Sequence, residues 1–397
     1  MSLSPARALS PEAILVYRSA SLAVESSETA ALAGPSLDWS RVLMLAEGEV
    51  ATASLGRQLH AARDVAVPEF AAEYLRKSGM VSDFRMRFLA ERLAETVRRL
   101  REGGVPVMLL KGAAVGALID PTFISRPMTD IDLLVRREDI AGARTAILAA
   151  GWEETTDLVL VELLRNHHHL PPFVDHRMPG IRLELHLSMF APDHSFEFDE
   201  ESLWSESRAS AAPFVGASVP SSEHLLLHGC VHFAWQHTMQ FGAWRTFRLV
   251  SAIVVADRLD WDQFVVLARA TKGATACYWT LRLARRMAGI AVPAEVLAKL
   301  SAPTPEWICS ALERHFVAAI VPGEGPPSPS ERLSRMLWNA ALRPQWSGHR
   351  TPGRWDPERR WERARGSFTT ETVPSRFARH LSQYRAWARF VSQTLLR

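Results

Sequence analysis

The chain has 397 residues, of which 47% are hydrophobic and 22% are charged. This composition is ordinary for a soluble globular protein, and the length is sufficient for two or three compact units. The formal net charge of only +3 excludes a chain whose overall charge would attract polyanions.

The three cysteines and the apolar segments bear on where the protein resides. Cys230, Cys277 and Cys309 lie far apart and form no CxxC motif. An odd number of scattered cysteines favours a reducing, cytoplasmic location over a disulfide-bonded secreted protein. No apolar run approaches the roughly 20 residues of a membrane-spanning helix, so we expect no membrane association.

The N-terminal part of the chain divides into two segments. Residues 1–36 are rich in Ala, Ser and Pro, and we expect them to be loosely ordered. Residues 37–102 have a helical pattern, which Asp38 or Ser40 would cap at its start. Near its end an apolar stripe recurs at helical spacing and predicts packing against the core. The stripe consists of Met86, Leu89, Leu93, Val97 and Leu100.

Residues 103–215 have the pattern of a core of strands and helices. A short apolar strand at 105–110 is followed at once by Lys111 and Gly112, and a helix is predicted for 113–119. A glycine turn between a strand and a helix exposes backbone N–H groups, which favours phosphate binding. Arg126 follows in a loop marked by prolines and supplies a further positive charge.

Two acidic residues begin the next apolar strand. Asp130 and Asp132 in the segment DIDLLV share one face of a strand, because side chains alternate between faces. At about 6–7 Å apart their carboxylates would repel by roughly 2–3 kcal/mol, so either one pKa rises or a cation bridges them. Oxygen ligands favour a hard ion such as Mg²⁺ or Mn²⁺. An isolated DxD is more often a solvated turn, and here the preceding phosphate-type turn favours the functional interpretation.

A third acid occurs on a second predicted strand. In the segment GIRLELHL at 180–187, Glu184 and His186 share one face and leucines occupy the other. One strand with one acid beside another strand with two acids is the arrangement of a metal-dependent nucleotidyl-transfer site. We therefore group Asp130, Asp132 and Glu184 as candidate catalytic residues and metal ligands.

These segments together resemble the uncharacterised nucleotidyltransferase family of the polymerase-beta-like superfamily. The resemblance rests on the Leu-Lys-Gly-Ala turn at 110–113, on RPMTDIDLLV at 126–135 and on ELH at 184–186. It implies an α/β fold of the α+β type, a small mixed sheet flanked by largely helical N- and C-terminal parts. It also implies that Lys111, Gly112, Arg126 and His186 contribute to binding a nucleoside triphosphate. The departure from the superfamily is the Gly-Ala pair, where most members have Gly-Ser or Gly-Gly.

The C-terminal part is predicted to be helical. Residues 216–320 form a helical domain in which His224, His228 and His232 line one stripe. Such histidines either bind zinc or, more commonly, line a cleft or the core. Residues 321–330 are a Pro/Gly-rich linker. Residues 331–397 are rich in arginine and tryptophan, and either bind nucleic acid or pack on the core as a helical tail.

These observations lead to one expected function and its alternatives. We expect an enzyme that moves a nucleoside monophosphate from a nucleoside triphosphate to an acceptor hydroxyl or phosphate, with Mg²⁺ or Mn²⁺. The resemblance favours a small-molecule or peptide acceptor in a biosynthetic setting, while tRNA or a protein side chain stays open. The alternative from another class is a non-catalytic binding or scaffold protein on the same fold.

Overall fold

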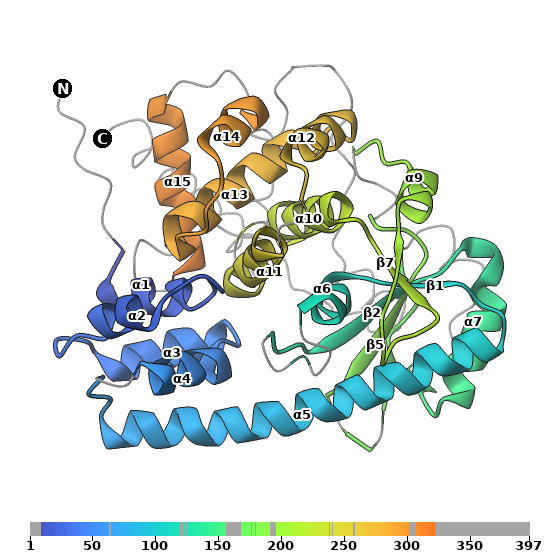
Figure 1. Cartoon of the computed structure of the whole chain (residues 1–397), viewed down its shortest axis with the longest axis horizontal. Helices are drawn as coiled ribbons and strands as arrows, with labels where there is room; N and C mark the ends of the chain where they lie inside the picture. Colours follow the sequence, from blue (N-terminus) through green and yellow to red (C-terminus); the bar gives the residue numbers. More distant parts are fainter. Residues whose placement is uncertain are drawn as a thin grey trace, which may run out of the picture.

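The structure is a computed structural model. It describes residues 9–62, 65–119, 123, 126–155, 168–175, 177, 178, 180–190, 196–237, 239, 241–256, 259–301 and 306–321. The predicted tail at 331–397 and the predicted linker beyond residue 321 lie outside the described residues. The described part combines helices with one mixed sheet, as the sequence predicted (Figure 1).

The sheet has seven strands in the spatial order β3-β4-β5-β2-β1-β7-β6. Parallel pairing joins β2 to β5 and β1 to β7, and the other neighbours are antiparallel. The strand bounds are β1 Val107–Leu109, β2 Asp130–Leu134, β3 Glu153–Glu154, β4 Phe173–Val174, β5 Arg182–His186, β6 Arg208–Ala209 and β7 Ala217–Val219. Strands β2 and β5 are therefore central, with partners on both sides.

Helices surround this sheet and form most of the described chain (Figure 1). Those before and within the sheet region are α1 Pro11–Arg18, α2 Ser26–Leu32, α3 Trp39–Gly48, α4 Thr52–Ala61, α5 Glu69–Glu102, α6 Lys111–Ile119, the 3₁₀ turn η1 Arg137–Asp139, α7 Ile140–Ala149 and α9 Glu200–Ser205. Those after it are α10 Ser222–Val231, the π-helical turn η2 His232–Gln236, α11 Ala243–Val255, α12 Trp261–Ala270, α13 Ala274–Ala288, α14 Ala294–Leu300 and α15 Glu306–Ile320.

The N-terminal segment differs from the expectation of loose order. Within residues 1–36, α1 begins with Ser10 as its cap and Pro11 at its first position, both of which favour a helix start. Ala13, Val16 and Tyr17 are fully buried in the core. The segment from Pro11 onward is therefore ordered because it contributes apolar side chains that the core buries.

Helix α5 is the longest element and connects two parts of the molecule. It runs along one side from α3 and α4 to the sheet, where it contacts β1 and α7 (Figure 1). The predicted apolar stripe from Met86 to Leu100 is buried on this helix. No helix in the described ranges, α5 included, is both long and apolar enough to cross a bilayer.

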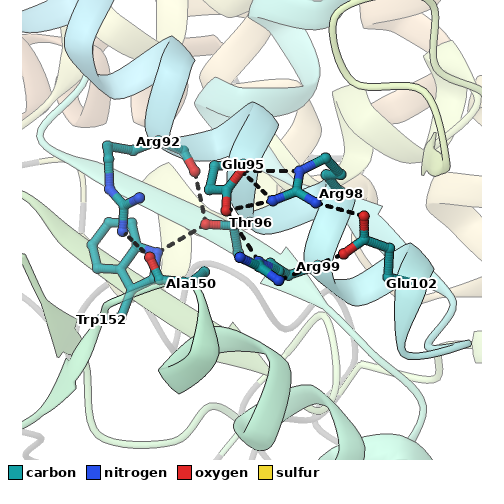
Figure 2. Close-up of polar contacts among 8 residues, drawn as sticks. All are labelled: Arg92, Glu95, Thr96, Arg98, Arg99, Glu102, Ala150 and Trp152. Carbon is teal, nitrogen blue, oxygen red and sulfur yellow. Dashed lines mark hydrogen bonds and ion pairs between the residues drawn. The ribbon is translucent and has the colours of Figure 1, made fainter.

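A polar network fixes the second half of α5 against the chain that follows α7 (Figure 2). Arg92 is buried, donates to the Ala150 carbonyl at 2.6 Å and pairs with Asp175 at 2.5 Å. The indole Nε1 of Trp152 donates to the Thr96 hydroxyl at 2.8 Å. These buried contacts set the position of α5 relative to the sheet, since a buried guanidinium is stable only where its donors are satisfied.

Helix α6 links the sheet to the helical part that follows it. It packs against β2 on one side and against α10 and α11 on the other. Its N-terminal residue, Lys111, follows directly after β1. This packing brings side chains from α10, η2 and α11 close to the end of β2 at which the two aspartates lie.

Candidate active site

The register of β2 and β5 places the predicted acids side by side. In this parallel pair Asp132 is opposite Glu184, and Leu134 is opposite His186. Opposed residues on neighbouring strands project from the same face, with backbones about 4.8 Å apart. On the other face Ile131, Leu133 and their partners on β5 are fully buried. Burial of that face determines the register, because a slip by one residue would move the acids into this apolar layer and the leucines to the face of Asp132 and His186.

Three potential ligand groups converge at this point. Oxygen or nitrogen atoms of Asp132, Glu184 and His186 all lie within 4.8 Å of one another. The Nε2 atom of His186 is 2.9 Å from Asp132 Oδ1 and 3.6 Å from Glu184 Oε2. From the sequence we predict Asp130 to be a metal ligand and His186 to contribute to nucleotide binding. In the structure the imidazole joins the two carboxylates, and Asp130 lies outside this group of three.

Asp130 occupies the more open end of the strand. Its side chain is half-buried, and its Oδ1 accepts a hydrogen bond from the Thr129 hydroxyl at 3.1 Å. Burial, and then the neighbouring charge of Asp132, raise the pKa of the Asp130 carboxyl. Of the carboxyl groups at this site, Asp130 is therefore the one most easily protonated.

Lys111 supplies the positive charge that the pair of acids requires. Its Nζ atom donates to Asp132 Oδ1 at 2.7 Å. Burial alone would raise the pKa of Asp132, but Lys111 and the hydrogen bond from His186 hold it well below its usual range. Burial would likewise raise the pKa of Glu184, but the nearby imidazole of His186 and the charge of Lys111 lower it to about 2. Both carboxylates are thus ionised at neutral pH.

The turn between β1 and α6 is tightly packed. Lys111 has a φ of 44°, in the left-handed region that non-glycine residues rarely adopt. At Gly112 a Cβ atom would lie 2.3 Å from Met128 Sδ and 2.4 Å from Arg126 Nη1. Only glycine fits there without displacing a neighbour. Arg126 is therefore held against the predicted phosphate turn, although it follows Gly112 by more than a dozen residues.

Two histidines that were not among the predicted site residues lie beside His186. The ring centroids of His168 and His169 are 5.4 and 5.3 Å from that of His186. Burial lowers the pKa of His168 well below its usual value and lowers that of His169. A run of three histidines has the same local pattern in a polar loop and in a buried cluster, so the sequence contained no signal that distinguishes them.

The predicted histidine stripe of 224, 228 and 232 separates into two roles. His224 Nδ1 is 2.9 Å from the hydroxyl of Ser221, the residue that caps α10. His228 is buried, and its Nδ1 has no hydrogen-bond partner in the described part of the chain. The π-helical turn begins at His232, and Gln236 at its end contacts His168 Nε2 at 3.4 Å. Burial lowers the pKa values of His228 and His232, and these two are also near enough to Lys111 for its charge to lower them further, whereas none of the described site residues acts on His224.

The donor set fits a divalent cation. Two ionised carboxylates and one imidazole are ligands that divalent metals accept, and the histidine extends the range beyond Mg²⁺ toward Mn²⁺ and other transition ions. Within the described residues the buried Nδ1 of His186 has no hydrogen-bond partner. Because burial opposes the charge on Asp132 and Glu184, a cation is needed at this point, and the ammonium group of Lys111, 2.7 Å from Asp132 Oδ1, supplies one positive charge.

Comparison with known proteins assigns the chain to a family. No curated protein and no solved structure matches it. The model of a family described as uncharacterised nucleotidyltransferase matches residues 35–289, well over half of the chain. The matched range contains β1, β2, β5, α6 and α11, and so every residue of the site described above. The chain therefore belongs to this uncharacterised nucleotidyltransferase family.

Proposed function

We propose that the protein transfers a nucleoside monophosphate from a nucleoside triphosphate to an acceptor hydroxyl or phosphate and releases pyrophosphate. The observation that carries this proposal is the convergence of Asp132, Glu184 and His186 on two parallel strands. They lie beside Lys111, at the glycine turn of a chain that belongs to a nucleotidyltransferase family. The favoured acceptor is a small molecule or a peptide.

The reaction requires an exchange of bonds at the α-phosphorus. The acceptor oxygen forms a bond to this phosphorus, the bond to the bridging oxygen of the β-phosphate breaks, and pyrophosphate leaves with the electron pair. The acceptor proton passes to a base. A pKa of about 2 makes Glu184 a poor base near neutral pH and supports its role as a metal ligand.

The side chains of the site have complementary roles in this proposal. Asp132, Glu184 and His186 would hold Mg²⁺ or Mn²⁺, with Asp130 as an additional carboxylate. A bound divalent ion would neutralise phosphate charge as it develops in the transition state. Lys111 and Arg126 would neutralise the remaining phosphate charge, and Gly112 would allow the backbone to approach it.

The test uses ATP labelled either at the α-phosphate or at the γ-phosphate. Each is incubated with the protein, Mg²⁺ or Mn²⁺, and pools of small metabolites, peptides or tRNA. We expect the α label to appear on an acceptor and the γ label to appear only in pyrophosphate. Transfer of the γ label to an acceptor would instead identify a phosphotransferase.

Asp132→Asn tests whether the site itself carries the activity. We expect the rate of α-label transfer to fall by roughly 10²–10³-fold, as when a preorganised charged group is removed from a transition state. Asp262→Asn is the matched control, because Asp262 is an exposed aspartate on α12 whose side chain pairs with Lys299. Wild-type activity in Asp132→Asn would overturn the proposal. Absence of transfer to every acceptor pool would favour the scaffold alternative.

A further inference from the structure

Helix α11 brings a positive charge from the helical part to the edge of the site. Arg245 lies in the first turn of α11, and its Nη1 donates to the Thr129 hydroxyl oxygen at 3.3 Å. The Thr129 hydroxyl in turn donates to Asp130 at 3.1 Å. Through these two hydrogen bonds Arg245 reaches the start of β2, although more than a hundred residues separate the two in sequence.

A second arginine nearby lacks the partner that a buried cation normally has. Arg126 is only 9% exposed, and among the described residues its Nε atom has no hydrogen-bond partner. In the part of the chain that the structure describes, no carboxylate forms an ion pair with Arg126 or Arg245. A buried guanidinium without an anion is unfavourable by several kcal/mol, so its retention indicates a ligand.

The guanidinium group of Arg126 lies at the glycine turn, where the charge of Arg245 also acts on it. Burial, and then the charge of Arg245, lower the pKa of Arg126 to about 10, while Asp130 and Asp132 partly offset this. The Nη1 atom of Arg126 lies against Gly112, at the N-terminus of α6. Arg126 is thus held at the N-terminus of α6 and Arg245 at Thr129, at the start of β2, and a multiply charged anion that contacts both would be stabilised by two positive charges.

We propose that Arg126 and Arg245 together bind the terminal phosphates of the triphosphate, so that the helical part completes the nucleotide site. The identity of the anion as a nucleoside triphosphate rests on the proposed function. The guanidinium groups offer paired N–H donors that match phosphate oxygens, which lysine does not. Arg245 is accordingly a binding and positioning residue, which the sequence analysis did not identify.

The test measures binding by calorimetry in the presence of Mg²⁺ for wild type, Arg245→Gln and Arg245→Lys. The probes are the nucleoside triphosphate, the corresponding monophosphate and inorganic triphosphate. The control is Arg285→Gln, which removes one positive charge from an exposed position on α13. We expect Arg245→Gln to bind the two triphosphates about 10- to 100-fold more weakly, and Arg245→Lys to be intermediate. Monophosphate affinity should change less than about twofold, which would also show that the variant site is folded.

The outcomes separate this proposal from the proposed function. If Arg245→Gln weakened monophosphate and triphosphate binding equally, or bound both like the wild type, the proposed role of the two arginines in binding the terminal phosphates would be refuted. The proposal of nucleotidyl transfer would be unaffected. Binding of inorganic triphosphate but of no nucleotide, if lost in Arg245→Gln, would support the pair and refute the nucleotide site. A wild-type protein that binds none of the triphosphates would overturn both.

Discussion

Replacing Gly112 with alanine tests the close packing at the turn between β1 and α6. The added Cβ would lie 2.3 Å from Met128 Sδ and 2.4 Å from Arg126 Nη1, whereas unstrained contacts are about 3.5–4.0 Å. Both side chains must therefore move by more than ~1 Å. Met128 is 3% and Arg126 is 9% exposed, so both would have to move within the packed interior. Overpacking of this kind costs about 1–3 kcal/mol in the free energy of unfolding.

The same substitution should also weaken triphosphate binding, because the displaced guanidinium is the one that we assign to the phosphates. Urea denaturation and calorimetry with a nucleoside triphosphate measure the two effects. Gly79→Ala is the matched control, since a Cβ at this position in α5 meets nothing within 4 Å. It should stabilise the helix by about 0.5–1 kcal/mol and leave binding unchanged. A Gly112→Ala protein with wild-type stability and wild-type affinity would refute the packing argument.

Three further predictions concern buried charges. Arg92→Met should lower the free energy of unfolding by about 3 kcal/mol, measured by urea denaturation, because Arg92 is 5% exposed and paired with a buried carboxylate. Arg177 is half-exposed and pairs with the same carboxylate, that of Asp175, so Arg177→Gln should lower the free energy of unfolding by less than about 1 kcal/mol. Equal losses of stability in the two variants would contradict this reasoning. Burial lowers the pKa of His228 well below its unfolded value near 6.5, so its stabilising contribution is present above pH 6.5 and is lost as the pH falls. In urea denaturation at a series of pH values, this histidine should lower the free energy of unfolding by up to about 1.4 kcal/mol per pH unit between pH 6.5 and 5. His228→Gln should reduce the pH dependence of the free energy of unfolding by that amount. Lys111→Met should strengthen binding of Mn²⁺ alone by tenfold or more, since a unit charge ~6 Å from the ion at an effective dielectric of 20 contributes roughly 3 kcal/mol per ion charge. The same variant should weaken triphosphate binding, and calorimetry that shows weaker Mn²⁺ binding would contradict the role of Lys111 as a substitute cation.

The parts of the site that local patterns encode could be predicted from the sequence. The alternation in DIDLLV and RLELH places acids on one face and leucines on the other, and the two strands pair in the register that brings Asp132 beside Glu184. The strand, the glycine turn and the helix around Lys111 are likewise indicated by residues that are adjacent in the sequence. In α5 the stripe from Met86 to Leu100 follows the helical period, and it is buried.

The remaining features depend on contacts between segments that are distant in the chain. Arg245 reaches β2 only because α6 packs between β2 and α11, and no pattern near residue 245 indicates that proximity. His168 and His169 join His186 because a bridge pairs His169 with the end of β5. Helix α1 differs, because its signals are local: the Ser10 cap and Pro11 favour a helix start within a segment whose overall composition indicates loose order.

The parallel pairing of β2 with β5 has a consequence for motion at the site. Asp132 and Glu184 are held by central strands with neighbours on both sides, so they cannot separate without breaking backbone hydrogen bonds of the sheet. We therefore expect any adjustment to a bound ligand on the side of α6, η2 and α11. The sheet thus holds Asp132, Glu184 and His186 in place, whereas His232 and Arg245 lie on helical elements outside the sheet. Hydrogen exchange should accordingly be slow in β2 and β5 with or without nucleotide, and should change on nucleotide binding mainly between His232 and Val255.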